Sequence, residues 1–170
     1  TSRTLAEVKS CDFGSWFNDE HPELAKPEFV GLAIPTLAEF ADRYGSDVGY
    51  LIEIKSPDAQ PGIEEALLDV LDGAGLTGPD GSGDVVVQSF SAESMRRMHD
   101  LRPELPLAQL VSVGAPIDEA MLDDISTYAV TFAPLYALVD QSVVDAAHAR
   151  CLKVTPWTVD DPAEMTRLVD

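Results

Sequence analysis

Short apolar runs rich in β-branched residues recur along the chain and predict strands. They lie at Val48–Ile54, Asp84–Phe90, Ala108–Val113, Thr127–Ala133 and Leu152–Thr158. Each run has the length of a strand. The intervals between successive runs leave room for a helical crossover, which is the connection that parallel strands need.

Helical periodicity and helix start signals fill those intervals. Thr36 and Glu39 form a capping-box pair, and Ser91 can cap a helix that runs to Leu101. Apolar repeats at three and four residues, or a cap followed by proline, predict further helices at Ile63–Leu71, at Gln141–Arg150 and from Asp161 onward. Strands and helices therefore alternate.

This alternation predicts an α/β fold with a parallel sheet whose strands are buried on both faces. Both an open doubly wound sheet and a (β/α)8 TIM-type barrel fit the pattern. A complete barrel takes about 250 residues, and a chain of this length supplies about five strand–helix units.

Two stretches are less regular. Gly73–Asp84 is expected to be a flexible loop rather than a phosphate cradle, and Thr4–Pro35 to be irregular, with Trp16 and Phe17 beside Gly14 in a packed loop.

The charge balance narrows the set of partners. Eleven Lys and Arg residues face 30 Asp and Glu residues, giving a formal net charge of -19, most simply a solvated acidic surface. This charge argues against nucleic acid or an anionic membrane surface as a partner. An anionic substrate would need a local cation, supplied by a metal or by a placed Lys or Arg.

Targeting and redox signals are sparse. No apolar stretch reaches the roughly 18 to 20 residues of a membrane span. The chain begins at Thr1 without a signal peptide, so we expect a processed, trimmed or partial chain, and either a cytoplasmic or a secreted location fits. Cys11 and Cys151 are expected to be free thiols, with a single long-range disulfide as the alternative.

The sharpest local signal is the segment LIEIKSP. Alternation along a strand places Glu53 and Lys55 on one face, near the strand's carboxyl end. Two charges on a buried strand are costly unless they are used or paired. Glu53 could bind a hard divalent cation and Lys55 could hold an anionic group, or the two could form a structural ion pair.

Two other strand ends carry candidate residues. In VVVQSF, Gln88 and Phe90 share a face, where Gln88 could donate to a polar ligand and Phe90 could form the wall of a pocket. In KVTPWTV, Lys153, Thr155 and Trp157 share a face, and Trp157 fits either a pocket wall or the packing of a core. The chain's histidines lack metal-ligand spacing, and each is expected to be a surface histidine or one whose hydrogen bonds are satisfied: His21, His99 and His148. No serine lies in a nucleophile elbow either. Taken together, the histidines and serines indicate no general acid or base.

Five segments resemble, in order, the glycerophosphodiester phosphodiesterase family. They are SCDFGSWF, IPTLAEF, LIEIKSP, VVVQSFSAESM and TPWTVDDPAEM, and the match covers essentially all of residues 1–170. IPTL and QSF are weak alone, but EIK, SF and the proline–tryptophan–threonine–valine segment form a specific combination. The resemblance implies a (β/α)8 barrel that hydrolyses glycerophosphodiesters to an alcohol and glycerol 3-phosphate with a divalent metal, Mg²⁺ or Ca²⁺.

The resemblance also implies residue roles. It makes Glu53 a carboxylate ligand of the metal, Lys55 a cation on the phosphate side and Trp157 a pocket wall, with Gln88 and Phe90 near the site. The family's His-Arg-Gly, Glu-x-Asp and His-Asp segments, with both catalytic histidines, would precede Thr1, and its Gly-Val-Asp-Gly segment would follow Asp170. Cys151 stands where the family has glycine in a turn from helix to strand.

The expected structure is therefore an incomplete barrel, a partial domain over residues 1–170 whose Glu53, Lys55 and Trp157 point to one region. On this interpretation the chain alone has little or no hydrolase activity. The alternatives are a non-catalytic binding remnant that retains Lys55 and Trp157, and an unrelated α/β protein with an open doubly wound sheet.

Overall fold

A computed structural model of the chain describes residues 3–77 and 84–169. The chain divides into two compact units, Thr1–Gly45 and Ser46–Asp170, each of which is described by itself. The expected flexible loop at Gly73–Asp84 falls partly on residues 78–83, which lie outside the described ranges.

The first unit is built from short helices. They are α1 (Leu5–Lys9), α2 (Ser15–Glu20), the 3-10 turn η1 (Pro27–Phe29) and α3 (Leu37–Tyr44). Thr36 and Glu39 form the predicted capping box at the start of α3, and Thr4 with Glu7 forms a second one at α1. These reciprocal bonds satisfy backbone N–H groups that the first helical turn leaves without partners.

The prediction of a packed loop around Trp16 and Phe17 was wrong, because both residues lie on α2. Asp12 starts this helix: its Oδ1 accepts from the backbone N–H groups of Gly14 and Ser15, both at 2.9 Å. Gly14 is required at the bend, since a Cβ there would lie 1.9 Å from the carbonyl oxygen of Phe29.

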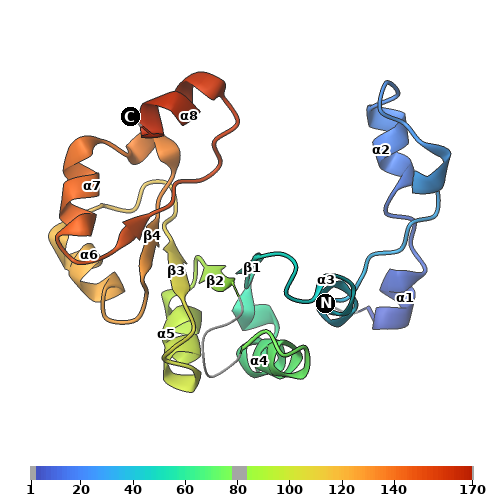
Figure 1. Cartoon of the computed structure of the whole chain (residues 1–170), viewed down its shortest axis with the longest axis horizontal. Helices are drawn as coiled ribbons and strands as arrows, with labels where there is room; N and C mark the ends of the chain where they lie inside the picture. Colours follow the sequence, from blue (N-terminus) through green and yellow to red (C-terminus); the bar gives the residue numbers. More distant parts are fainter. Residues whose placement is uncertain (1–2, 78–83, 170) are drawn as a thin grey trace. The chain divides into compact units, whose positions relative to one another are not determined.

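The second unit contains a five-stranded parallel sheet in sequential order (Figure 1). Its strands are β1 (Tyr50–Glu53), β2 (Val85–Ser89), β3 (Leu107–Leu110), β4 (Thr131–Ala133) and β5 (Lys153–Val154). Each strand pairs in parallel with the next one along the chain. A doubly wound sheet reverses its strand order at a switch point, so the sequential order excludes that alternative and confirms the barrel-type arrangement.

Helices follow each strand. They are η2 (Pro57–Ala59) with α4 (Ile63–Gly73), α5 (Ala92–Leu101), α6 (Glu119–Ile125), η3 (Tyr136–Leu138) with α7 (Gln141–His148), and α8 (Pro162–Val169). Neighbouring helices pack against one another, α4 on α5 and α6 on α7, and α5 also packs on β2 and β3. The sequence pattern did not predict α6, which begins where the Asp118 side chain accepts from the Met121 N–H at 2.8 Å.

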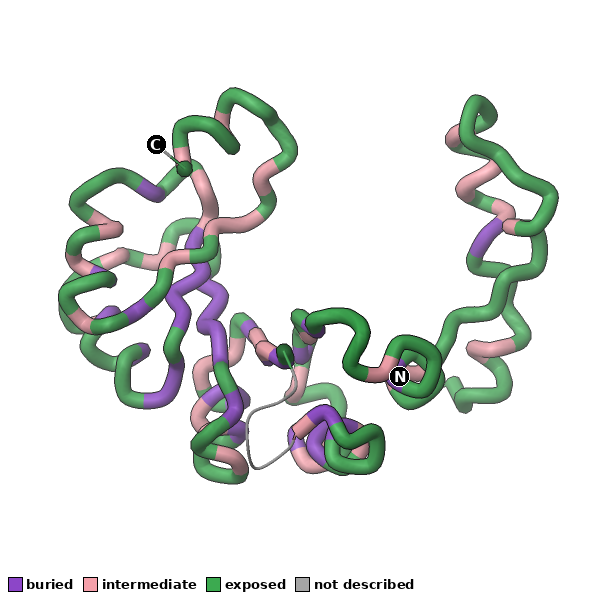
Figure 2. Tube along the Cα trace, in the orientation of Figure 1, coloured by how far each residue is buried: buried purple, intermediate pink, exposed green. Residues whose placement is uncertain are grey.

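Burial differs across the sheet (Figure 2). Every residue of β3 and β4 is buried, as expected for a parallel strand with both faces covered. In β1 the prediction of burial on both faces was wrong: Tyr50 is 6% exposed, whereas Leu51 on the opposite face is 61% exposed. The reason is that the helices of the second unit cover the face of β1 that carries Tyr50 and Ile54, and leave the face of Leu51 open.

Cys11 and Cys151 are both free and exposed, in agreement with the preferred prediction. Cys151 follows α7 in a left-handed conformation, with φ of 59°, in the turn that the sequence marked as one suited to glycine. Among the described residues, no helix combines the length and the apolar character that crossing a bilayer requires.

Candidate active site

The strand register places the predicted site residues on one face of the sheet. Glu53 pairs with Gln88, and the same row continues through Ala108 and Thr131 to Lys153. Alternate residues of a strand share a face, so the residues two positions further on, Lys55 and Phe90 among them, lie on this face as well. We call this surface the strand-end face: Glu53, Lys55, Gln88, Phe90, Thr155 and Trp157.

This surface is the face of β1 and β2 that the helices leave uncovered. On the opposite face, Ile54 is 3% exposed and Ser89 is 1% exposed. Glu53 and Lys55 are exposed, and Gln88 is half-buried. The carboxyl ends of parallel strands, which carry these side chains, are the usual position of catalytic residues in a barrel.

An aromatic contact joins the residue after β2 to a residue that follows β5. The rings of Phe90 and Trp157 meet edge to face, with 5.3 Å between their centroids. The indole Nε1 of Trp157 donates to the carbonyl oxygen of Ala133 at 2.9 Å, which fixes the ring. Phe90 remains 42% exposed, so this pair forms the side of a surface and not the inside of a core. The role of Trp157 as a pocket wall stays a prediction.

Glu53 and Lys55 remain available for a ligand. In the described part of the chain neither residue forms an ion pair, so the predicted alternative of a structural Glu–Lys pair is not found there. Over the same residues, no hydrogen bond, ion pair or ring contact joins either side chain to Trp157. Directly after Lys55 the backbone turns at Ser56, which adopts a left-handed conformation with φ of 52°. A strained turn of this kind fixes where the preceding side chain leaves the strand.

The strand that carries these two charges is held by a buried hydroxyl. Ser89 donates from Oγ to the carbonyl oxygen of Ile54, between Glu53 and Lys55, at 2.7 Å. The same Oγ accepts from the Ser91 N–H at 3.1 Å, at the start of α5. Sequence reasoning placed Ser89 on the face away from the site, which is correct, but it did not identify this connection between the ends of β1 and β2.

The described residues do not by themselves complete a metal centre. Within residues 3–77 and 84–169, no group of three or more His, Cys, Asp or Glu side chains is positioned to hold a metal ion. Glu53 offers one exposed carboxylate, whereas Ca²⁺ takes six to eight oxygen ligands and Mg²⁺ an octahedron of them. The described residues therefore contribute at most part of such a site.

The two histidines of the second unit lie on helices and not at the strand ends. His99 is on α5 and His148 ends α7. His21 follows α2 in the first unit, where its ring lies 4.8 Å from that of Phe17. Neither His99 nor His148 is therefore placed among the strand-end residues as a general acid or base.

A cavity of about 240 Å³ adjoins the strand-end face at Phe90. Its walls are mostly apolar, and the buried side chains of Gln109 and Tyr128 line it. The Tyr128 hydroxyl donates to Oε1 of Gln109 at 3.0 Å. Sequence reasoning missed both residues. The one available signal was a single amide within the apolar strand PLAQLV.

Solved structures with the same fold include phosphodiesterases. One is an Oleispira antarctica phosphodiesterase in complex with the product sn-glycerol-3-phosphate, with a TM-score of 0.79 and 23% identity over 98% of this chain and 62% of that one. Another is a glycerophosphodiester phosphodiesterase from Parabacteroides distasonis, with a TM-score of 0.72 and 16% identity over 99% of this chain and 63% of that one. At these identities the likeness establishes the fold.

Curated relatives are closer in sequence. The chain is 45% identical over 170 residues to a glycerophosphodiester phosphodiesterase of Bacillus subtilis strain 168, covering 98% of this chain and 58% of that protein. It is 30% identical over 169 residues to the enzyme of the same name from Caldanaerobacter subterraneus, covering 98% of this chain and 63% of that protein. The chain thus spans less than two thirds of the length of these relatives.

The family comparison covers the whole chain. The model of the glycerophosphoryl diester phosphodiesterase family matches residues 1–170, which include every residue of the strand-end face. Together with the sequential parallel sheet, this match confirms the resemblance read from the LIEIKSP and TPWTV segments. The chain belongs to the glycerophosphoryl diester phosphodiesterase family.

Proposed function

We propose that the full-length protein containing this chain hydrolyses glycerophosphodiesters to an alcohol and glycerol 3-phosphate. The observation that carries the proposal is the strand-end face, on which an exposed lysine, an exposed glutamate and an aromatic pair occupy the carboxyl ends of parallel strands. The bound product reported for the Oleispira antarctica structure supports glycerol 3-phosphate as the group recognised.

Lys55 binds the phosphate in this proposal. A chain with a net charge of -19 repels an anionic diester at long range, so the attraction must be local. The exposed Lys55 ammonium has no ion-pair partner among the described residues, and it can place a point charge beside the phosphate oxygens. The Phe90–Trp157 wall accommodates the carbon side of the glycerol, and the half-buried Gln88 amide can donate to a substrate oxygen.

Glu53 contributes one oxygen ligand to a divalent cation, Mg²⁺ or Ca²⁺, whose other ligands come from outside the described residues. When bound, such a cation neutralises phosphate charge and orients the diester. The proposal requires no partner besides this cation and the small-molecule diester.

Proton transfer must come from elsewhere in the full-length protein. General acid–base catalysis typically contributes 10² to 10⁴-fold to a rate, and the described residues of the strand-end face include no histidine. We therefore expect the isolated chain to show little or no hydrolysis of glycerophosphodiesters, whereas the full-length protein is active.

A paired assay with added Mg²⁺ or Ca²⁺ tests this function. It compares the isolated chain, the full-length protein, and the full-length protein with Glu53→Gln or Lys55→Met. Glu53→Gln should lower metal affinity and activity together, because it removes an anionic ligand while keeping the side-chain shape. Lys55→Met should raise KM, because it removes the cation that binds the phosphate. Robust turnover by the isolated chain, or an unaffected Glu53→Gln protein, would contradict these roles.

A non-catalytic binding protein is the second candidate, favoured by the lack of an acid–base pair on the described strand-end face. It would retain Lys55 and Trp157 for recognition. Calorimetric binding of glycerol 3-phosphate by a full-length protein that shows no turnover with either metal would establish this candidate over the hydrolase.

A further inference from the structure

Gln109 connects the end of β3 to the end of β2, next to the aromatic wall. Its side chain is 5% exposed, and Nε2 donates to the carbonyl oxygen of Ser89 at 3.1 Å and to that of Leu110 at 2.8 Å. The carbonyl oxygen of Phe90 lies 3.4 Å from the same nitrogen. Ser89 and Gln109 form the last register pair between these strands, so the amide holds the β2 backbone where the regular ladder ends.

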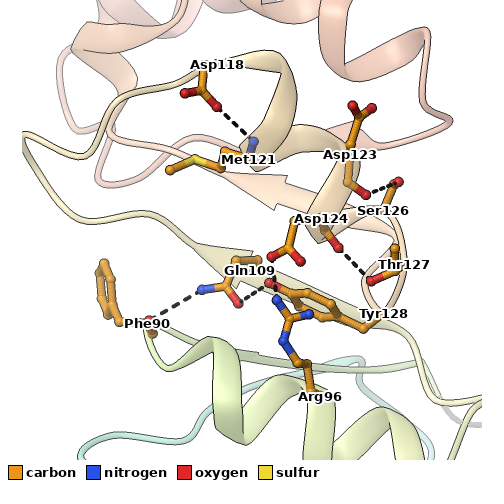
Figure 3. Close-up of polar contacts among 10 residues, drawn as sticks. All are labelled: Phe90, Arg96, Gln109, Asp118, Met121, Asp123, Asp124, Ser126, Thr127 and Tyr128. Carbon is orange, nitrogen blue, oxygen red and sulfur yellow. Dashed lines mark hydrogen bonds and ion pairs between the residues drawn. The ribbon is translucent and has the colours of Figure 1, made fainter.

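Three carbonyl oxygens around one nitrogen determine how the amide is turned. The reverse orientation would set the amide oxygen against those carbonyl oxygens, so the nitrogen must face them. The oxygen Oε1 then faces Tyr128, whose hydroxyl donates to it at 3.0 Å (Figure 3). Both ends of the buried amide are thereby satisfied.

Tyr128 is itself held in place. The Arg96 guanidinium lies over its ring, 4.4 Å from the centroid, and forms an ion pair with Asp124 at 2.5 Å (Figure 3). Burial raises the pKa of Tyr128 to about 12, so the hydroxyl keeps its proton throughout the neutral range. It therefore remains a donor, and the Gln109 amide keeps one orientation.

We propose that Gln109 is a positioning residue, which sets the Phe90–Trp157 wall of the substrate site through the backbone of Ser89 and Phe90. The proposal rests on the proposed function. Gln109 lies on the face opposite the site and does not touch substrate. It fixes the point where Phe90 leaves β2, and the Phe90 ring in turn contacts Trp157. A wall that binds ground state and transition state alike changes KM and leaves kcat nearly unchanged.

The first test uses the chain itself and needs no activity. In a Trp16→Phe background, Trp157 is the one remaining tryptophan. Gln109→Met keeps the side-chain length and removes the hydrogen bonds, and we expect it to raise the acrylamide quenching constant of Trp157 about twofold as the wall loosens. Tyr128→Phe should move the same signal in the same direction by a smaller amount, and it tests the proposal even if Gln109→Met does not fold.

Leu122→Ala is the matched control. Leu122 is 1% exposed on α6, so its truncation lowers stability without removing a bond to Gln109. If Gln109 only stabilised the sheet, Gln109→Met and Leu122→Ala would both lower the melting temperature, and the quenching constant of Trp157 would be the same in the two variants. The proposal is overturned if the Trp157 quenching constants of Gln109→Met and Tyr128→Phe equal that of Leu122→Ala.

The second test is kinetic, in the full-length protein. Gln109→Met should raise KM for a glycerophosphodiester about three- to tenfold with kcat nearly unchanged, the range expected for losing a buried hydrogen-bond network. A fall in kcat at constant KM overturns the proposal. If the unaltered full-length protein shows no turnover, the proposed function fails, and Trp157 quenching still decides the role of Gln109.

Discussion

Residues 3–45 bury only Gly14 and Ala41, whereas the described part of the second unit buries side chains from every strand of its sheet except β5. The first unit is held by local hydrogen bonds, such as the capping boxes of α1 and α3, and by the Lys9–Glu39 ion pair. The second unit is held by apolar residues far apart in sequence. The difference teaches that the stability of the two units should respond to different perturbations. The second unit should be sensitive to lost core volume, and the first unit to altered helix caps, turns and pH.

The largest effect is expected from the core of the second unit. Phe132 is 0% exposed on β4, so Phe132→Ala should lower the free energy of unfolding by about 3–5 kcal/mol through lost burial and a cavity. Urea unfolding followed by Trp157 fluorescence, in a Trp16→Phe background, measures the change. Val130→Ala, which alters a residue that is 48% exposed, should change the same quantity by about 0.5 kcal/mol or less. Equal losses in the two variants would contradict this account of the core.

A smaller effect is expected from the turn before α2. Gly14→Ala forces a Cβ against the Phe29 carbonyl oxygen, and the resulting overpacking should cost the first unit about 1–3 kcal/mol. Trp16 fluorescence in a Trp157→Phe background reports the loss. Gly73→Ala is the control, because no atom lies within 4 Å of a Cβ at that position. A Gly14→Ala protein with an unchanged Trp16 signal would show that the bend can relax.

The smallest effect concerns pH. The hydrogen bond from Lys9, followed by that from the Thr36 backbone, lowers the pKa of Glu39 from 4.5 to about 2. The contribution of ionised Glu39 is therefore complete above pH 4.5 and is lost as the pH falls towards 2. Lys9→Met should move the Glu39 titration, followed by carboxyl NMR, towards the ordinary value. Identical titrations in the two proteins would remove Lys9 as the cause.

The sequence predicted the parts of the fold that depend on periodicity. Short apolar runs rich in β-branched residues identified five strands, and the Thr36–Glu39 pair identified the start of α3. Three short helices were not predicted. α1 and α2 lie in the stretch Thr4–Pro35, which was expected to be irregular, and α6 covers only Glu119–Ile125. Elements of this length carry too few periods for an apolar repeat to be recognised.

The candidate site likewise combines features that the sequence predicted with features that it did not. Alternation placed Glu53 with Lys55 and Gln88 with Phe90, because a side chain's face follows from its position in the strand. The contact between Phe90 and Trp157 depends on how widely separated strands meet, and the bond between Gln109 and Tyr128 joins residues 19 positions apart. A single buried amide in an apolar run carries no information about its partner. The exposed face of β1 was missed because a strand's local sequence pattern does not show whether a second layer covers each of its faces.

The sequential order of the sheet also bears on synthesis at the ribosome. Each strand pairs only with those immediately before and after it, so β2 can dock on β1 as soon as both have emerged, without waiting for later residues. Parallel pairing across a crossover, such as Tyr50 with Val85, forms slowly, and chains are made from the N-terminus at about 5–20 residues per second. The second unit can therefore assemble strand by strand during translation. At each stage the newest strand presents an unpaired edge, the surface that a nascent chain most needs shielded from its neighbours on a polysome.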